Sequence, residues 1–158
     1  MTDLASADMV ALLEDGPLRS FRDWPPAELP AGPSGVYTVW RGTSFLYVGM
    51  SWAHRVDGVT DKARGVFGRL ASHASGRRSG DQFCIYICDR YVIPRLTAAD
   101  MEALANGERI LDRRTKQFIA EHLDYRVAPT SSGAEARAIE AAVRRNGLAR
   151  AGRPIINP

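Results

Sequence analysis

The sequence is poor in cysteine and histidine, which limits the metal chemistry open to it. Its 158 residues include two cysteines, Cys84 and Cys88, and three histidines. Two cysteines four apart within one apolar run cannot form a zinc site alone, and the histidines are not spaced to complete one. We therefore expect both cysteines to be reduced thiols in the core.

Long apolar runs and targeting signals are also missing. No stretch approaches the roughly 20 apolar residues that a membrane span needs, and the N-terminus lacks a basic flank followed by an apolar run. We therefore expect a cytoplasmic protein.

No repeat, low-complexity tract or extreme charge is present. Apolar residues make up 45% of the chain and charged residues 25%, which is typical of a globular domain and argues against disorder. The length suits one domain with a single core. A net charge of +3 and a pI near 9.1 permit nucleic acid as a partner without singling it out.

Residues 1–33 are predicted to form an N-terminal extension. A short apolar pattern up to about Ser20 is compatible with an accessory helix, formed by Leu4, Met9, Val10, Leu12 and Leu13. The proline-rich stretch from Trp24 to Pro33 then excludes regular structure and leads the chain to the core.

Two runs rich in β-branched and aromatic residues, 35–40 and 45–49, flank Gly42–Ser44 and predict a β-hairpin. A three-residue loop predicts these cross-strand pairs: Arg41 with Phe45, Val39 with Tyr47, and Tyr37 with Gly49. Tyr37 and Tyr47 would then share one face as diagonal neighbours, roughly 7–8 Å apart, and Gly49 would leave open space beside Tyr37.

The remaining elements follow from apolar periodicity and capping residues. We predict a helix over 59–75, a strand over 83–88, a helix start at 97–100, a longer helix over 108–122, a short strand over 125–128 and a last helix over 133–146. Arg69 and His73 lie four residues apart and so project from neighbouring turns of one helix face. Ser132 and Glu135 form a capping-box pattern for the last helix.

Each polar residue that is a candidate for chemistry also has an ordinary structural interpretation. Because the cap occupies Glu135, Glu140 is the free carboxylate of the last helix, but an isolated Glu140 is more often solvated and paired with Arg144. Strand tyrosines are commonly half-buried packing residues, Arg69 a surface arginine and His73 a histidine satisfied by water. Asn157, near the end of the chain, would ordinarily be a frayed terminus.

The order of these residues carries more weight than any one of them. The chain contains, in sequence, Gly35-Val36-Tyr37, then Tyr47-Val48-Gly49 ten residues on, Arg69-x-x-x-His73 on a helix, Glu140 on a later helix, and Pro154-Ile155-Ile156-Asn157. This series resembles the GIY-YIG nuclease family over roughly residues 35–158. The resemblance implies an α+β fold with a small three- to four-stranded, mainly antiparallel sheet flanked by helices, in the order β-β-α-α-β-α. It places a nuclease domain at 34–158.

The resemblance also implies roles for individual residues. Glu140 would hold a single divalent cation, Mg²⁺ or Mn²⁺, which suits a carboxylate ligand with mostly water around the ion. Tyr37 would deprotonate the attacking water, with Tyr47 in support; that requires a tyrosine pKa lowered near the metal. Arg69 would neutralise charge on the phosphate.

Two further residues match later parts of the motif. His73 corresponds to a histidine found in some members of the family, where it orients groups or assists proton transfer. Asn157 corresponds to a late asparagine that braces the site.

The chain departs from the family pattern in three places. Valine replaces isoleucine in both tripeptides, without chemical consequence. The separation of Gly49 from Arg69 is long, which leaves Arg55 and Arg64 as alternatives, although only Arg69 has a histidine one turn onward. Residues 90–122 form an insertion-like block rich in basic residues that would serve substrate selection or a dimer contact, unless its charges are simply solvated.

We therefore expect a DNA endonuclease of a restriction or mobile-element defence type. Cutting both strands with so small a chain would require a homodimer or two successive nicks. Two alternatives stay open: a catalytically idle nucleic-acid-binding module, and an RNA-cleaving enzyme with the same site. Binding alone does not need Glu140, which disfavours the first, and nothing in the sequence identifies the sugar.

Overall fold

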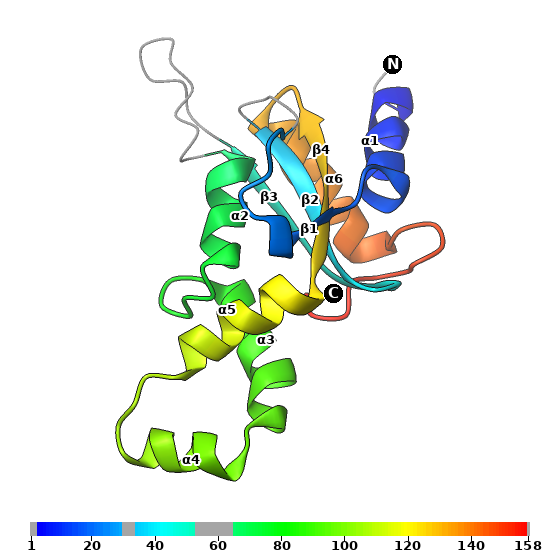
Figure 1. The fold of residues 1–158 in the computed structure, drawn as a ribbon. Helices are drawn as coiled ribbons and strands as arrows, with labels where there is room; N and C mark the ends of the chain where they lie inside the picture. Colours follow the sequence, from blue (N-terminus) through cyan, green and yellow to red (C-terminus); the bar gives the residue numbers. More distant parts are fainter. Residues whose placement is uncertain (1–2, 30–33, 53–64, 158) are drawn as a thin grey trace.

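The fold is α+β and is built on a four-stranded antiparallel sheet, as expected (Figure 1). The computed structural model describes residues 3–29, 34–52 and 65–157. The strands are β1 (Arg19–Ser20), β2 (Ser34–Arg41), β3 (Ser44–Trp52) and β4 (Asp124–Thr130), in the spatial order β1-β4-β2-β3. Strand β2 is therefore central and is buried along almost its whole length.

Helices cover both faces of this sheet (Figure 1). The α-helices are α1 (Asp3–Asp15), α2 (Val66–Ala74), α3 (Gln82–Ile87), α4 (Ala98–Ala105), α5 (Leu111–His122) and α6 (Gly133–Asn146). Short turns of other helix types are η1 (Phe21–Asp23), η2 (Cys88–Val92) and η3 (Ile93–Arg95). Within the described ranges, no helix combines the length and apolar character needed to cross a membrane.

Alternation along β2 divides the core into two clusters, because successive side chains of a strand point to opposite faces. Tyr37 and Val39 face α2, α3 and α5, in a cluster that also contains Leu70, Phe83 and Ile119. On the other face, Val36 and Trp40 pack with residues of α1 and α6: Leu13, Ala136, Ile139 and Val143. The two clusters hold helices from early, middle and late parts of the chain against one sheet.

The β2–β3 hairpin has a shorter loop than we predicted, and a bulge corrects the difference. Arg41 pairs with Ser44 rather than Phe45, and Trp40 pairs with Phe45. The register shifts between Val39 and Trp40, where Leu46 is the extra residue of β3. A bulge adds one residue to one strand, so beyond it the predicted pairs are restored: Val39 with Tyr47, and Tyr37 with Gly49.

The strand predicted over 83–88 is wrong: these residues continue as α3 and the π-helical turn η2. Asp81 caps the helix, since its carboxylate accepts hydrogen bonds from the backbone N–H groups of Phe83 and Cys84. A short apolar run has the same pattern in a helix as in a buried strand, and periodicity alone cannot separate the two. The prediction of reduced, buried thiols at Cys84 and Cys88 is confirmed.

Other boundaries follow the sequence more closely. Helix α6 has the predicted bounds, and the Ser132 side chain caps it by accepting the N–H of Glu135. The Glu135 carboxylate reaches Ser131, one residue before the cap. Helix α5 begins at Leu111, three residues later than predicted, and α2 begins at Val66; residues 59–64 of that predicted helix lie outside the described part.

The C-terminal segment completes the edge of the sheet at β3. The backbone N–H of Ile155 donates to Phe45 O at 3.1 Å, and that of Ile156 donates to Leu46 O at 2.8 Å. These bonds hold the end of the chain against the strand that carries Tyr47, and so bring residues more than 100 positions apart to one place.

Candidate active site

The site is organised around Tyr37, which lies on β2 and has no exposed surface. A Cβ atom added at Gly49, its cross-strand partner, would lie 2.3 Å from the Tyr37 hydroxyl oxygen. Only glycine therefore permits the hydroxyl to cross over β3. The space that we predicted beside Gly49 exists and is filled by Tyr37 itself.

A chain of hydrogen bonds joins Tyr37 to His73 and Asp81. The Tyr37 hydroxyl lies 2.8 Å from His73 Nε2, and His73 Nδ1 lies 2.8 Å from Asp81 Oδ2. A carboxylate only accepts hydrogen bonds, so Nδ1 carries the proton and donates to Asp81. Nε2 of the neutral ring is then left as the acceptor for the tyrosine O–H.

The surroundings keep His73 neutral and Asp81 ionised. Burial lowers the pKa of His73, although the Asp81 carboxylate acts in the opposite direction. Burial alone would raise the pKa of Asp81, but hydrogen bonds from His73 and Ser72 outweigh it and lower that pKa to about 2. The Ser72 hydroxyl donates to Asp81 Oδ2 at 2.6 Å, which fixes the carboxylate between α2 and α3.

Arg69 lies one helical turn before His73 and contacts both tyrosines. Its guanidinium lies within electrostatic and hydrogen-bonding reach of the Tyr37 and Tyr47 hydroxyls and acts to lower the pKa of both. Burial would lower the pKa of Arg69, but the Tyr37 hydroxyl raises it overall, so the side chain remains cationic. Burial and the neighbouring Tyr47 raise the pKa of Tyr37 well above its ordinary value, against the opposing effect of Arg69.

The hydrogen-bonded chain of Tyr37, His73 and Asp81 is called the relay below. Tyr47 lies between this buried relay and the surface. Its ring stacks on Tyr37 with centroids 6.4 Å apart, so the two tyrosines share one sheet face as predicted. Burial raises the pKa of Tyr47, and its hydroxyl lies within electrostatic range of both Arg69 and Glu140. Tyr47 thus connects the α2 side of the site with α6.

Glu140 makes the contact that its ordinary interpretation predicts. Its side chain is 17% exposed, and one carboxylate oxygen lies 3.5 Å from Arg144 Nη1, one turn onward. The distance is longer than that of a strong charge-assisted hydrogen bond, so the carboxylate is only loosely held.

Asn157 is an ordered part of the site edge, contrary to the ordinary interpretation of a frayed terminus. Its side-chain amide donates to Val48 O at 2.7 Å and accepts the Val48 N–H at 3.1 Å. The side chain thereby continues the backbone pairing of the C-terminal segment with β3, directly beside Tyr47.

The sequence reasoning missed Asp81. The signal was available, because Asp is a preferred helix N-cap and Asp81 directly precedes the apolar run. The assignment of that run to a strand concealed it. Of the alternatives to Arg69, Arg55 and Arg64 lie outside the described residues.

The donor set fits a divalent cation held largely by water. The described ranges contain no group of three or more histidine, cysteine, aspartate or glutamate side chains placed to hold a metal ion. Both ring nitrogens of His73 are engaged, and so are both carboxylate oxygens of Asp81. Glu140 is the carboxylate left for a cation at this edge, and Mg²⁺ is commonly bound through one or two carboxylates while it keeps several waters.

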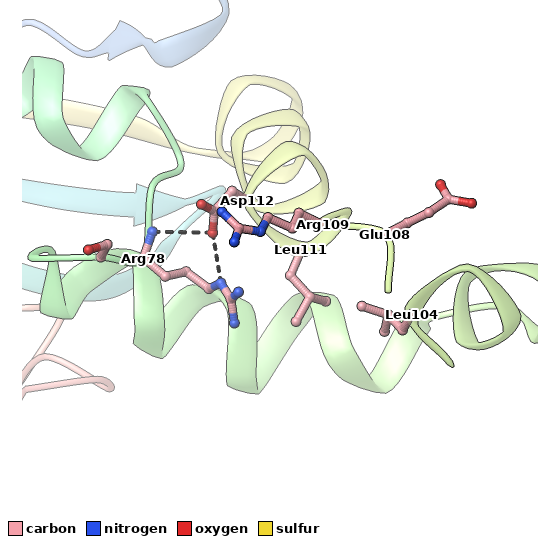
Figure 2. Close-up of a pocket in the computed structure, with 7 residues that line it drawn as sticks. Arg78, Leu104, Glu108, Arg109, Leu111 and Asp112 are labelled. Carbon is pink, nitrogen blue, oxygen red and sulfur yellow. Dashed lines mark hydrogen bonds and ion pairs between the residues drawn. The ribbon is translucent and has the colours of Figure 1, made fainter. Parts of the chain in front are cut away.

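Two surface hollows of about 310 Å³ differ in their charge. In the first, Asp112 accepts hydrogen bonds from both the backbone N–H and the side chain of Arg78, at 3.4 and 2.8 Å (Figure 2). The charge of Arg78 is therefore neutralised within the protein, and the other arginine of this hollow, Arg109, is balanced by the carboxylate of Glu108 in the same lining. The second hollow includes Glu140 in its lining. The other lining residues are Ala141, Arg144, Arg145 and Arg153.

Comparison with known proteins does not assign the chain to a family. No protein-family model, no curated protein and no solved structure matches it.

Proposed function

We propose that this protein is a metal-dependent endonuclease of the GIY-YIG type that hydrolyses phosphodiester bonds in DNA. One observation carries the proposal: the Tyr37 hydroxyl lies between a neutral histidine that can take its proton and an arginine that can stabilise its anion. Packing alone would require a hydrogen-bond partner for this buried hydroxyl, but not a cation beside the same group. The ordered series of motif residues in the sequence supports the same function.

The raised pKa of Tyr37 is opposite to the lowered tyrosine pKa that its role as a base requires, so we assign removal of the phenolic proton to His73, within the relay of Tyr37, His73 and Asp81. Burial keeps Tyr37 protonated, so it cannot act as a free phenolate. His73 Nε2 accepts the phenolic proton as Tyr37 takes one from the attacking water, and the Asp81 carboxylate stabilises the imidazolium that forms. The transfer from Tyr37 to His73 follows a hydrogen bond that the structure contains, whereas the bond from water to Tyr37 would form when substrate and water enter the site.

Arg69 and Glu140 supply the electrostatic part of the site. The Arg69 guanidinium lies within reach of both tyrosine hydroxyls, and its planar fork can donate to phosphate oxygens as negative charge builds on them. Glu140 would hold the divalent cation, which lowers the pKa of a bound water and neutralises the leaving oxygen. The loose ion pair with Arg144 leaves this carboxylate able to exchange partners.

Substrate must reach a hydroxyl that has no exposed surface in the present structure. Tyr47 stacks on Tyr37, and Arg69 lies within reach of the Tyr37 hydroxyl, so both side chains lie against the group that substrate must reach. We propose that phosphate binding draws the Arg69 guanidinium outward and opens the path to Tyr37. Catalysis then occurs only with substrate in place.

The test is incubation of the purified protein with supercoiled plasmid, linear duplex DNA, single-stranded DNA and RNA, each with Mg²⁺ or with EDTA. We expect Mg²⁺-dependent nicking or cutting of DNA, and no cutting by Glu140→Ala. Cleavage by Glu140→Ala at more than a few per cent of the wild-type rate would contradict the role of Glu140. Cleavage of RNA alone would overturn the substrate assignment, and binding without cleavage would favour an idle module.

A further inference from the structure

The hollow beside Glu140 contains an excess of positive charge that the fold does not neutralise. Arg144, Arg145 and Arg153 line it together with one carboxylate, that of Glu140. Three arginines elsewhere are paired with carboxylates of the protein: Arg78 with Asp112, Arg114 with Asp100, and Arg150 with Asp15. Within the described part of the chain, no carboxylate other than Glu140 forms an ion pair with a hollow arginine.

The chain turns sharply to form this hollow. Helix α6 ends at Asn146, and the cap residue that follows, Gly147, has a φ of +82°, a conformation that side-chain-bearing residues rarely adopt. A Cβ atom there would lie 2.5 Å from the carbonyl carbon of Gly152, so only glycine lets the returning segment lie so close. That return places Arg153 beside the last turns of α6, where its Nε donates to Arg144 O at 2.9 Å.

The same contacts tie the hollow to the candidate active site. Arg144 Nε donates to the Asn157 backbone carbonyl at 3.1 Å, while the Asn157 side chain binds Val48 of β3. Arg144 Nη1 lies 3.5 Å from Glu140. The Arg144 guanidinium is therefore held next to the carboxylate to which we assign the cation.

We propose that this hollow is a binding subsite for backbone phosphates of DNA that flank the cleaved bond. All three arginines are exposed, and the planar fork of a guanidinium matches the geometry of phosphate oxygens. The subsite rests on the proposed nuclease function for its position relative to the cleaved bond, but DNA binding by the arginines is independent of cleavage. The arginines contribute affinity and strand position, not sequence recognition.

The test measures binding of a fluorescein-labelled DNA duplex by anisotropy over a series of salt concentrations in EDTA, where no cleavage occurs. The variant is the double substitution Arg145→Gln/Arg153→Gln. Each lost phosphate contact lowers the slope of log K against log[salt] by about 1, so we expect a drop of about 2 together with weaker binding. Arg144 is left intact because of its contact with Glu140.

The matched control is Arg22→Gln/Arg77→Gln, which removes two exposed arginines that do not line the hollow and changes the net charge equally. We expect the control to keep the wild-type slope. An unchanged slope in Arg145→Gln/Arg153→Gln, or equal changes in both double variants, would overturn the subsite. If the double variant fails to fold, Arg145→Gln alone should lower the slope by about 1, and no change would again refute the proposal.

This experiment separates the subsite from the nuclease function. Suppose that Arg145→Gln/Arg153→Gln lowers the salt slope but the wild-type protein never cuts DNA in Mg²⁺. The phosphate subsite would then stand, and the proposed nuclease activity would be refuted. If the wild-type protein cuts DNA but both double variants keep the wild-type slope, the nuclease activity would stand and the subsite would be refuted. Failure of the wild-type protein to bind the duplex at all would contradict the subsite directly, and loss of slope on an RNA duplex alone would overturn DNA as its ligand.

Discussion

Asp81→Asn tests the relay most selectively. It reverses the direction of the hydrogen bond between residue 81 and His73, while the side chain keeps nearly the same size and shape. The asparagine oxygen can still accept the N–H groups of Phe83 and Cys84, and Asn is as good an N-cap as Asp. Its NH₂ group would then face His73 Nδ1, which must become an acceptor. The proton moves to Nε2, and His73 can no longer accept the proton of Tyr37.

The expected effect on rate is large, whereas the effect on folding is modest. Reversing the tautomer of a catalytic histidine by the same substitution lowers turnover by about 10⁴ in a serine protease. We therefore expect Asp81→Asn to lower single-turnover cleavage by about 10³–10⁴, and DNA affinity in EDTA to remain at the wild-type level. Loss of a charge-assisted hydrogen bond should lower the free energy of unfolding by about 1.5–3 kcal/mol.

Ser72→Ala is the matched control, since it removes the other side-chain hydrogen bond to Asp81 Oδ2 without changing the His73 tautomer. We expect it to lose about 1 kcal/mol of stability and to cut at close to the wild-type rate. A folded Asp81→Asn protein that cuts within about tenfold of wild type would refute the relay, since a reversed tautomer cannot support that rate.

Stability against pH checks the electrostatic part of the same prediction. The pKa of Asp81 is about 2 in the folded protein, below its ordinary value of 3.8, so ionised Asp81 stabilises the fold above about pH 4. That contribution is lost as the pH falls through about 2. The stability difference between the wild type and Asp81→Asn should therefore be largest at neutral pH and shrink on acidification, as urea unfolding at several pH values will show.

Three further predictions concern the tyrosine and metal sides of the site. Glu140→Ala should abolish cleavage and leave the melting temperature unchanged. Glu135→Ala should lose about 0.5–2 kcal/mol of unfolding free energy and keep its activity. The opposite pattern in the two variants would reverse the roles assigned to these two residues. Arg69→Lys should lower single-turnover cleavage by about 10²–10³ with little change in DNA affinity, and a normal rate would remove Arg69 from the transition state. Gly49→Ala should displace the Tyr37 hydroxyl, lose about 1–3 kcal/mol of unfolding free energy and stop cleavage, and a variant that cuts normally would contradict the close approach.

The hairpin and the last helix were predictable because local signals specify them. Pairing of Tyr37 with Gly49 followed from strand period and loop length, and the bounds of α6 followed from the Ser132 cap. The loop was misjudged by one residue, yet the bulge at Leu46 restored the register that matters for the site. A bulge has no distinct sequence signal here, so its presence became visible only in the fold.

The relay itself was harder to predict because its third residue depends on tertiary structure. His73 and Asp81 lie eight residues apart, on two helices whose packing no local pattern specifies. Recognition of the α3 segment as a helix would have identified Asp81 as a cap, but not as the partner of His73. The ordering of Asn157 likewise depends on a return of the chain over the end of α6 to β3, a contact between residues 109 positions apart.

Plasmid cleavage by the wild type and Tyr37→Phe, measured side by side in Mg²⁺, tests the central claim most directly. Phenylalanine keeps the buried ring and removes only the hydroxyl that joins His73 and Arg69. The account predicts that the wild type converts supercoiled DNA to nicked or linear forms, and that Tyr37→Phe binds DNA with unchanged affinity but does not cut it. Equal cleavage by both proteins, or no cleavage by either with Mg²⁺ or Mn²⁺, would contradict it.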